Sequence, residues 1–318
     1  MHRRTFLAAG FAACATPLVA RAQSARTTLR IGFIPTDVAA QPYYARELGL
    51  FEKAGFDLQL TPLTNGAGIM SAVAGGSLDI GQGNIVALAA AHERGLTLSF
   101  LCATNYYSPK DATTGIVVVD RDADIHGPKD LEGKIVAVSG LKEIAGLAVR
   151  NWIDAGGGDS TKVKFIELPF PVQPDAVRAK RIDAAAINRA FAPTAGAPGD
   201  SLRVIGQAFD SVAQRWIISG WLADNDWIAK HPDDARRFLD VMRDATKWAN
   251  ANKHDAAQVL AKNLNQDLAK IEAIPRPDYQ TAITPQLVQP GINLTAKYGL
   301  IKAPFPAQEI ISAAAARS

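Results

Sequence analysis

The alternation of apolar strand segments with short helical segments in the first third of the chain is the feature that most restricts the fold. Apolar runs at 29–34, 57–60, 78–80 and 100–103 are separated by helical segments, and polar loops rich in Gly, Asn, Asp or Thr follow the first three. Strands that alternate with helices predict a parallel α/β sheet. In such sheets ligands bind beyond the carboxyl ends of the strands. This part of the chain is therefore predicted to hold a small molecule.

A second α/β series follows the first. Its predicted strands are 115–119, 134–138, 163–168, 183–187 and 202–205, and its predicted helices are 141–154 and 175–179. The apolar run 215–222 is interpreted as a return crossing to the first lobe. Four further helices without intervening strands, 232–251, 254–263, 267–274 and 285–298, are expected to buttress that lobe.

This order predicts two lobes and two crossings between them. We expect lobe 1 to comprise residues 27–107 and 218–318, and lobe 2 to comprise 108–217. Two crossings between α/β lobes form a hinge, and a hinge predicts a cleft.

A short internal repeat suggests that the two lobes are related. Residues 72–79 and 176–183 both read as a helix end, a tight turn, and an apolar-Asp pair that starts a strand. The match spans eight residues and is also compatible with chance. Lys180 stands where Gly76 stands, and a positive φ there would cost a lysine about 1 kcal/mol. Asp79 and Asp183 are accordingly interpreted as turn-stabilising residues rather than an acid/base pair.

The first 22 residues have the pattern of an export signal. Arg3-Arg4 precedes an Ala-rich apolar stretch, and Ala20-Arg21-Ala22 is a cleavage site of the small-x-small kind. The stretch is too short to span a membrane, and Pro17 interrupts it. We therefore expect a cleaved twin-arginine signal peptide at 1–22 and a periplasmic mature protein. Lipidation at Cys14 remains an alternative.

The charge and cysteine content exclude several classes of partner. The formal net charge is +3, and removal of Arg3, Arg4 and Arg21 gives 3 − 3 = 0, so nothing favours nucleic acid or a membrane surface. Cys102 would be the one cysteine left, so no disulfide is expected. The mature histidines are scattered, so we expect neither a metal nor a cofactor.

Three segments resemble a known family. They are 44–56, 72–79 and 183–185, and they are similar to the nitrate, sulfonate, taurine and thiamine-pyrimidine group of periplasmic solute-binding proteins, which serve ABC importers. The resemblance covers roughly residues 27–232. It implies an α/β, two-lobe periplasmic-binding-protein fold (type II) with parallel-sheet lobes. It also implies a monomer that binds a small-molecule ligand and docks on an inner-membrane ABC permease.

The resemblance places ligand contacts in the loops after strands. In the first lobe these positions are Thr36, Asp37, Gln41, Asn65, Gly66, Ala67, Gly83, Asn84, Thr104 and Asn105. In the second lobe they are Ser139, Gly140, Leu141, Asn188 and Arg189. Among the aromatic residues near the cleft, Tyr43 and Trp216 are the predicted stacking residues.

The residues leave the chemistry of the ligand open. The helix start at Asn65 suits an anion, but Asn65 is equally an ordinary N-cap. Arg189 either clamps an anion or pairs with a nearby carboxylate. Lys142, in the first turn of the predicted helix 141–154, is interpreted as a solvated surface charge.

We therefore expect an exported binding protein that captures a small sulfonate- or carboxylate-like anion and is not an enzyme. A flat heterocycle such as a thiamine-pyrimidine precursor is the second choice. A pyrimidine-precursor synthase and a ligand-sensing domain are the rival classes, because the same scaffold serves both.

Overall fold

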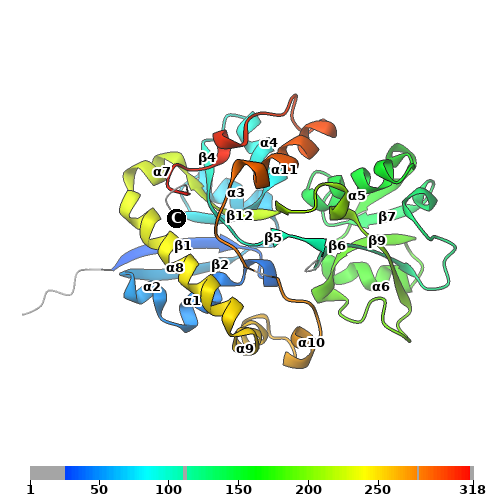
Figure 1. Ribbon diagram of the computed structural model, residues 1–318, viewed down its shortest axis with the longest axis horizontal. Helices are drawn as coiled ribbons and strands as arrows, with labels where there is room; N and C mark the ends of the chain where they lie inside the picture. Colours follow the sequence, from blue (N-terminus) through cyan, green and yellow to red (C-terminus); the bar gives the residue numbers. More distant parts are fainter. Residues whose placement is uncertain (1–25, 110–112, 278, 316–318) are drawn as a thin grey trace, which may run out of the picture.

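Two five-stranded sheets lie toward opposite ends of the molecule in the computed structural model (Figure 1). The structure describes residues 26–109, 113–277 and 279–315. The predicted signal peptide and Cys14 lie outside the described residues. Among the described helices, none has the length and apolar character to span a membrane.

The first sheet confirms the parallel α/β series. It has the order β2-β1-β3-β12-β4, in which β1 runs parallel to both β2 and β3. The strands are β1 (Thr27–Phe33), β2 (Phe56–Pro62), β3 (Ile80–Asn84), β4 (Leu98–Ala103) and β12 (Ser219–Asp224). Leu29, Ile31 and Phe33 alternate along β1 and join one core, as a strand with a side-chain period of two requires.

The second sheet has the order β10-β6-β9-β7-β8. Strands β7 (Ile135–Val138), β8 (Lys164–Glu167) and β9 (Ala184–Asn188) run parallel, whereas β6 (Thr114–Asp120) is antiparallel to both β9 and β10 (Leu202–Gln207). Each of the five predicted strands of this series is confirmed within a few residues.

The apolar run 215–222 is extended, as predicted, and forms two strands. Trp216–Ile217 forms β11, which pairs with β5 (Tyr106–Tyr107) in a two-stranded sheet between the lobes. The chain then enters the first sheet as β12, antiparallel to β3 and β4. Hydrophobicity predicts that such a run is extended, but the choice of strand partners depends on the whole sheet.

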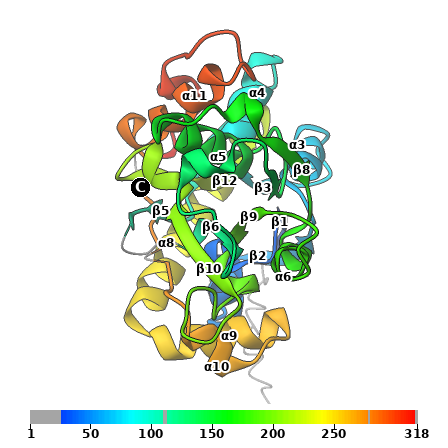
Figure 2. The same cartoon turned by 90° about the vertical axis from the view of Figure 1, so that its right-hand side faces the viewer.

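Helices cover both sheets (Figures 1 and 2). They are α1 (Gln41–Glu47), α2 (Leu50–Lys53), α3 (Gly66–Ala74), α4 (Ile85–Glu93), α5 (Ile144–Ala155), α6 (Gln173–Arg178), α7 (Asn225–Lys230), α8 (Pro232–Ala251), α9 (Lys253–Leu264), α10 (Leu268–Glu272) and α11 (Pro285–Lys297). Helix α8 begins with Pro232 at a first-turn position, where a missing N–H costs nothing. Phe238, Val241 and Met242 lie on its predicted apolar face and are buried.

Strand β3 differs from the prediction. The sequence placed a strand at 78–80 and a loop at 81–84, whereas the strand runs from Ile80 to Asn84. A Cβ on Gly81 would lie 2.6 Å from Ile69, and one on Gly83 would lie 2.3 Å from Met70. The glycines are needed because α3 packs directly on this strand, so here they indicate close packing rather than a loop.

The internal repeat is confirmed in detail. Gly76 has a φ of 72° and Lys180 a φ of 54°, so both turns use the left-handed conformation. Asp79 accepts a hydrogen bond from the backbone N of Arg30 at 2.8 Å, and Asp183 accepts one from Ile135 N at 2.7 Å. Each aspartate thus fastens the turn before its strand to a neighbouring strand.

Side chains from both sheets join one continuous hydrophobic core. Val117 and Val136 of the second sheet belong to the same buried cluster as Trp216 and residues of α4 and α11. Polar contacts between α5 and the end of α11 reinforce this connection. Tyr298 Oη donates to Asp154 at 2.6 Å, and Lys297 Nζ donates to Asn151 at 2.6 Å.

Candidate functional site

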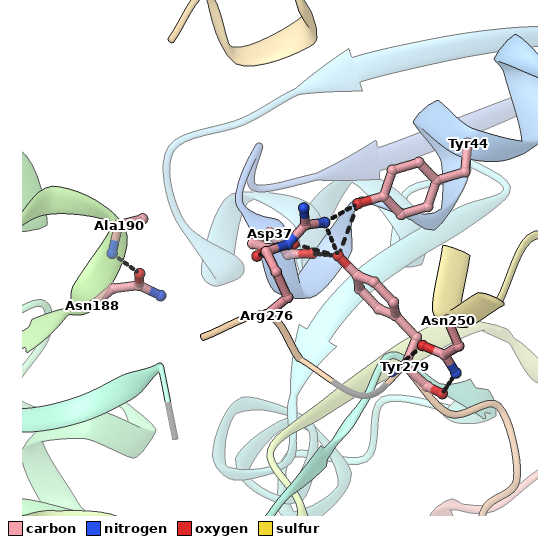
Figure 3. A network of polar contacts seen from close by, with 7 residues as sticks. All are labelled: Asp37, Tyr44, Asn188, Ala190, Asn250, Arg276 and Tyr279. Carbon is pink, nitrogen blue, oxygen red and sulfur yellow. Dashed lines mark hydrogen bonds and ion pairs between the residues drawn. The ribbon is translucent and has the colours of Figure 1, made fainter. Parts of the chain in front are cut away.

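The carboxyl ends of the parallel strands in both sheets lie next to the crossing between the lobes. Strand β4 leads into β5, and β6 begins at Thr114, which pairs with Asn188 at the end of β9. Strands β7 and β8 run in the same direction as β9. Figure 3 shows Asn188 on one side and Asp37 with Arg276 on the other. The predicted ligand loops of the two lobes therefore face each other.

A buried polar network lies at the carboxyl end of β1. Arg276 Nε donates to Asp37 Oδ2 at 2.8 Å, and Arg276 Nη2 donates to Tyr44 Oη at 2.7 Å. Tyr279 Oη donates to the Asp37 carboxylate and its main-chain O, and lies 2.9 Å from Tyr44 Oη (Figure 3). The side chains of Asp37 and Arg276 are only 5% and 11% exposed. The network joins the loop after β1 to the segment after α10.

Burial and charge act in opposite directions on the two ionised groups. Burial raises the pKa of the Asp37 carboxyl, while the Arg276 charge and the Tyr279 hydroxyl oppose that rise. Burial alone would lower the pKa of Arg276, but Tyr279 and Asp37 outweigh it and raise it above the usual value. Arg276 therefore stays charged and is largely neutralised by Asp37.

One nitrogen of this guanidinium is unused. Arg276 Nη1 is buried and has no hydrogen-bond partner among the described residues. A buried N–H without an acceptor costs about 1–3 kcal/mol, so this nitrogen is a strong candidate to bind an additional oxygen. Arg276 was not predicted as a site residue because it lies outside both α/β series. It lies between Pro275 and Pro277, which restrict the backbone. This was the sequence feature that could have marked Arg276 as a residue held in a fixed position.

Three predicted residues join α1 to the end of the first sheet. Gln41 Nε2 donates to the main-chain O of Thr104, and Thr104 Oγ1 lies 2.8 Å from Ser219 Oγ. Asn105 Oδ1 accepts from Thr104 Oγ1 at 3.1 Å. Gln41, Thr104 and Asn105 are all buried, and Gln41 Oε1 is without a partner in the described part of the chain.

The loops after β2 and β3 converge. Asn65 caps α3 by accepting from Gly68 N at 2.8 Å, and Asn84 caps α4 by accepting from Ala87 N at 2.8 Å. A Cβ on Gly66 would lie 3.7 Å from Asn84 Nδ2, so the two helix starts are neighbours. Asn65 and Ala67 are exposed.

The remaining predicted residues of this lobe are less accessible. Gly83 lies inside β3 and is buried. Thr36 is partly exposed and donates from Oγ1 to Ile34 O at 3.4 Å. Tyr43 is 6% exposed and packs edge-on against Phe33.

In the second lobe, acidic side chains surround the loop after β7. The loop contains Ser139, Gly140 and Leu141, and Leu141 N donates to Glu167 Oε1 at 2.7 Å. Burial and the nearby Glu167 charge raise the pKa of the Glu143 carboxyl. Lys142 is exposed, as predicted. These carboxylates make the loop a poor place for an anion, since like charges repel.

The loop after β9 carries a positive charge, in contrast to the acidic side chains around the loop after β7. Asn188 Oδ1 accepts from Ala190 N at 2.9 Å, and Asn188 Nδ2 donates to Thr114 Oγ1 at 2.9 Å. Next to it, Arg189 begins the short helix η6 (Arg189–Phe191). Burial lowers the pKa of Arg189. Within the described ranges, its side chain donates one hydrogen bond, from Nη1 to Ala195 O at 3.3 Å.

Arg189 has no carboxylate within ion-pair distance among the residues that the structure describes. Of the two interpretations made from the sequence, the carboxylate pair is therefore not formed in the described chain. Its Nε is also buried and unpartnered there. A guanidinium without a counter-ion on the loop after β9 favours a negatively charged ligand.

Trp216, the second predicted stacking residue, is fully buried. Its ring packs between Tyr107 and Phe209, with centroids 6.1 and 5.5 Å away. In this structure the ring supports the hinge pair β5–β11.

No group of three or more His, Cys, Asp or Glu side chains placed to hold a metal occurs within the described ranges. His92, His126, His231 and His254 each lie beside a carboxylate of Glu309, Asp124, Asp234 and Glu272, respectively. Cys102 is free and buried, and burial raises the pKa of its thiol.

This fold and site define the class of two-lobe periplasmic-binding-protein folds. The structure superposes on the periplasmic aliphatic sulphonate-binding protein SsuA of Escherichia coli with a TM-score of 0.75 at 18% identity, covering 90% of this chain and 97% of that one. The periplasmic nitrate-binding protein NrtA of Synechocystis PCC 6803 gives a TM-score of 0.71 at 15% identity, covering 90% and 85%. These likenesses establish the fold.

The chain belongs to the NMT1/THI5-like family, whose model matches residues 37–256. A relative in Brucella abortus (strain 2308), which is described only as a candidate binding protein, is 27% identical over 286 residues. That alignment covers 86% of this chain and 82% of the relative. The resemblance inferred from the sequence is thereby confirmed.

Proposed function

We propose that this protein is the solute-binding component of an ABC importer and that it captures a small organic anion, sulfonate- or carboxylate-like, between its two lobes. Family membership and the two-lobe fold support a binding protein. The sulphonate- and nitrate-binding proteins of the same fold take anions, according to their names. The captured anion is then delivered to an ABC permease without chemical change.

The observation that carries the proposal is the unpaired charge of Arg189, which lies on one facing edge opposite the Asp37–Arg276 pair. A guanidinium can hold a carboxylate or sulfonate with two parallel N–H bonds. From the other lobe, Arg276 Nη1 has N–H groups that no described residue uses, although this nitrogen is buried until the loop around it moves. An anion held by both arginines would stabilise the closed form through contacts that an open form lacks.

The proposal also includes the organisation of the chain. Residues 1–22 are an export signal cleaved after Ala22, and the mature protein works in the periplasm as a monomer. Residues 27–107 and 218–318 form the first lobe, and 108–217 form the second. The pairing of β5 with β11 supports this division, because both crossings meet there.

A flat heterocycle with amino groups is the second candidate ligand. Glu143 and Glu167 favour it, because carboxylates accept hydrogen bonds from amino groups. An enzyme that needs a histidine on these ligand loops is disfavoured, because the four histidines 92, 126, 231 and 254 lie in or beside α4, the segment before η3 (Pro128–Leu131), α8 and α9.

A thermal-shift screen tests the proposal. Ethanesulfonate, taurine, benzoate and nitrate are compared with an aminopyrimidine and with ethanol as a neutral control. A ligand at 100 times its Kd should stabilise the protein by about 2.7 kcal/mol. We expect an organic anion to raise the Tm of wild type and of Arg181→Gln, an exposed arginine of the same lobe, but not of Arg189→Gln. A shift with the aminopyrimidine alone would favour the second candidate.

A further inference from the structure

Three apolar side chains stand at the ligand edge of the second lobe without a place in the core. Phe170 and Val172 belong to the short helix η5 (Phe170–Val172) after β8, and Phe191 ends η6 after β9. Val172 is 48% exposed, and both rings are partly exposed. None of the three is among the described side chains that form or pack against the hydrophobic cores.

The two rings contact each other in a way that leaves ring surface uncovered. Phe170 and Phe191 are nearly parallel, with an interplanar angle of 10° and centroids 6.0 Å apart. Fully overlapped rings would lie roughly 3.5–4.0 Å apart, the optimal distance between carbon atoms. The pair is therefore offset, and part of each face is free to stack on a flat group.

The backbone holds these rings in place. Pro169 and Pro171 flank Phe170 and restrict its loop. On the other side, the Asn188 side chain caps η6 through Ala190 N at 2.9 Å. Binding on a preorganised aromatic pair costs little ordering entropy.

Arg189 and Phe191 are the first and last residues of the same one-turn helix. The loop after β9 therefore carries both a positive charge and an aromatic ring within one turn. An aliphatic anion as small as ethanesulfonate would use the charge and leave most of the ring surface wet.

We propose that the ligand is an aromatic anion, whose carboxylate or sulfonate binds Arg189 and whose ring stacks on the Phe170–Phe191 pair. This inference rests on the proposed function and specifies its substrate class. The ring contact sets selectivity for aromatic over aliphatic anions, and the arginine sets the requirement for negative charge.

Isothermal titration calorimetry on the purified protein tests this assignment. Benzenesulfonate and benzoate are compared with ethanesulfonate and propionate, so that the head group is matched within each pair. Phe191→Leu keeps apolar volume but removes the ring face, and Phe170→Leu does the same from the other loop. Phe305→Leu is the control, because that ring packs at a tilt against His92 in the first lobe, away from these loops.

We expect wild type and Phe305→Leu to bind one aromatic anion about tenfold more tightly than its aliphatic partner, in line with the strength of aromatic pairs. Phe170→Leu and Phe191→Leu should each lose most of this preference, while their affinity for the aliphatic anion stays unchanged. The pair that shows the effect distinguishes a sulfonate from a carboxylate.

Equal affinities for aromatic and aliphatic partners in wild type would overturn the aromatic assignment and leave the anion proposal standing. The aromatic assignment would also be overturned if Phe191→Leu lowered the affinity for the aromatic and the aliphatic anion of a pair by the same factor. If none of the four anions binds, the anion proposal itself fails, and the aromatic assignment fails with it.

Discussion

Arg276 Nε lies 2.8 Å from Asp37 Oδ2, and this ion pair joins two segments that are 239 residues apart in the sequence. It fixes the segment after α10 against the loop after β1, beside the proposed ligand site. Each charge is buried, so each depends on the other for compensation.

We predict that Asp37→Asn lowers the free energy of unfolding by about 3 kcal/mol, because it leaves the Arg276 charge buried without its counter-ion. Urea denaturation at neutral pH measures the change. Asp175→Asn is the control. Asp175 forms an exposed pair with Arg178, and its loss should change the free energy by less than about 1 kcal/mol. Similar effects of the two substitutions would contradict the role given to the buried pair.

The repeated turn yields a prediction with opposite signs in the two lobes. Lys180→Gly should stabilise the protein by about 1 kcal/mol, because glycine adopts a positive φ without strain. Gly76→Ala should destabilise it by a similar amount. A Cβ on Gly76 would meet no atom within 4 Å, so backbone strain is the only expected cost. Chemical denaturation of both variants checks the signs, and a destabilised Lys180→Gly would refute the account.

The contact of Tyr298 with Asp154 predicts a pH dependence. Partial burial would raise the pKa of the Asp154 carboxyl, but hydrogen bonds from Tyr298 and from Ser160 outweigh burial and lower it. A lowered carboxyl pKa stabilises the fold at neutral pH, and this stabilisation is lost as pH falls through the folded-state pKa. Tyr298→Phe should therefore lower the free energy of unfolding by about 1 kcal/mol at pH 7, and by less in acid.

Tyr106→Phe is the matched control for this pH dependence. Tyr106 Oη donates to the main-chain O of Ala282 at 2.8 Å, and that acceptor does not titrate. Urea denaturation of both variants across acidic and neutral pH should show a pH-dependent loss for Tyr298→Phe alone. The same pH profile for both would rule out the Asp154 contact as the cause.

Asn65 allows its capping role to be separated from ligand binding. Asn65→Leu removes the cap of α3 and should cost about 1 kcal/mol of stability. Asn65→Asp keeps a capping oxygen but adds negative charge to the loop after β2. If this loop contacts an anion, Asn65→Asp should lower its affinity severalfold while stability is retained. Calorimetry and denaturation together test this, and unaltered affinity in Asn65→Asp would remove the loop from the site.

Much of the fold was predictable because it depends on local pattern. The period of two in β1, the apolar face of α8 and the turns at Gly76 and Lys180 are all readable in short windows of sequence. The insertion of β12 between β3 and β4 was not readable in this way. A strand segment shows that it is extended and apolar, whereas its neighbours are chosen by the packing of the complete sheet.

The loops that carry the site could be predicted from the sequence, but the contacts between their side chains could not. Sequence reasoning placed Asp37 and Arg189 on ligand loops, but it could not show that Arg276 neutralises the first while the second has no carboxylate partner in the described chain. Glu167 was missed for the same reason, since its contact with Leu141 N joins two different strand ends. Phe170 and Phe191 come together although β7 lies between their strands.

A crystal structure of the protein with the organic anion that raises its Tm most tests the central claim directly. The account predicts that the acidic group lies about 3 Å from the Arg189 guanidinium, between the carboxyl ends of the two sheets. An anion bound elsewhere, for example in the hollow of about 200 Å³ lined by Arg30, Trp227 and Lys230, with the facing edges free of ligand, would contradict it.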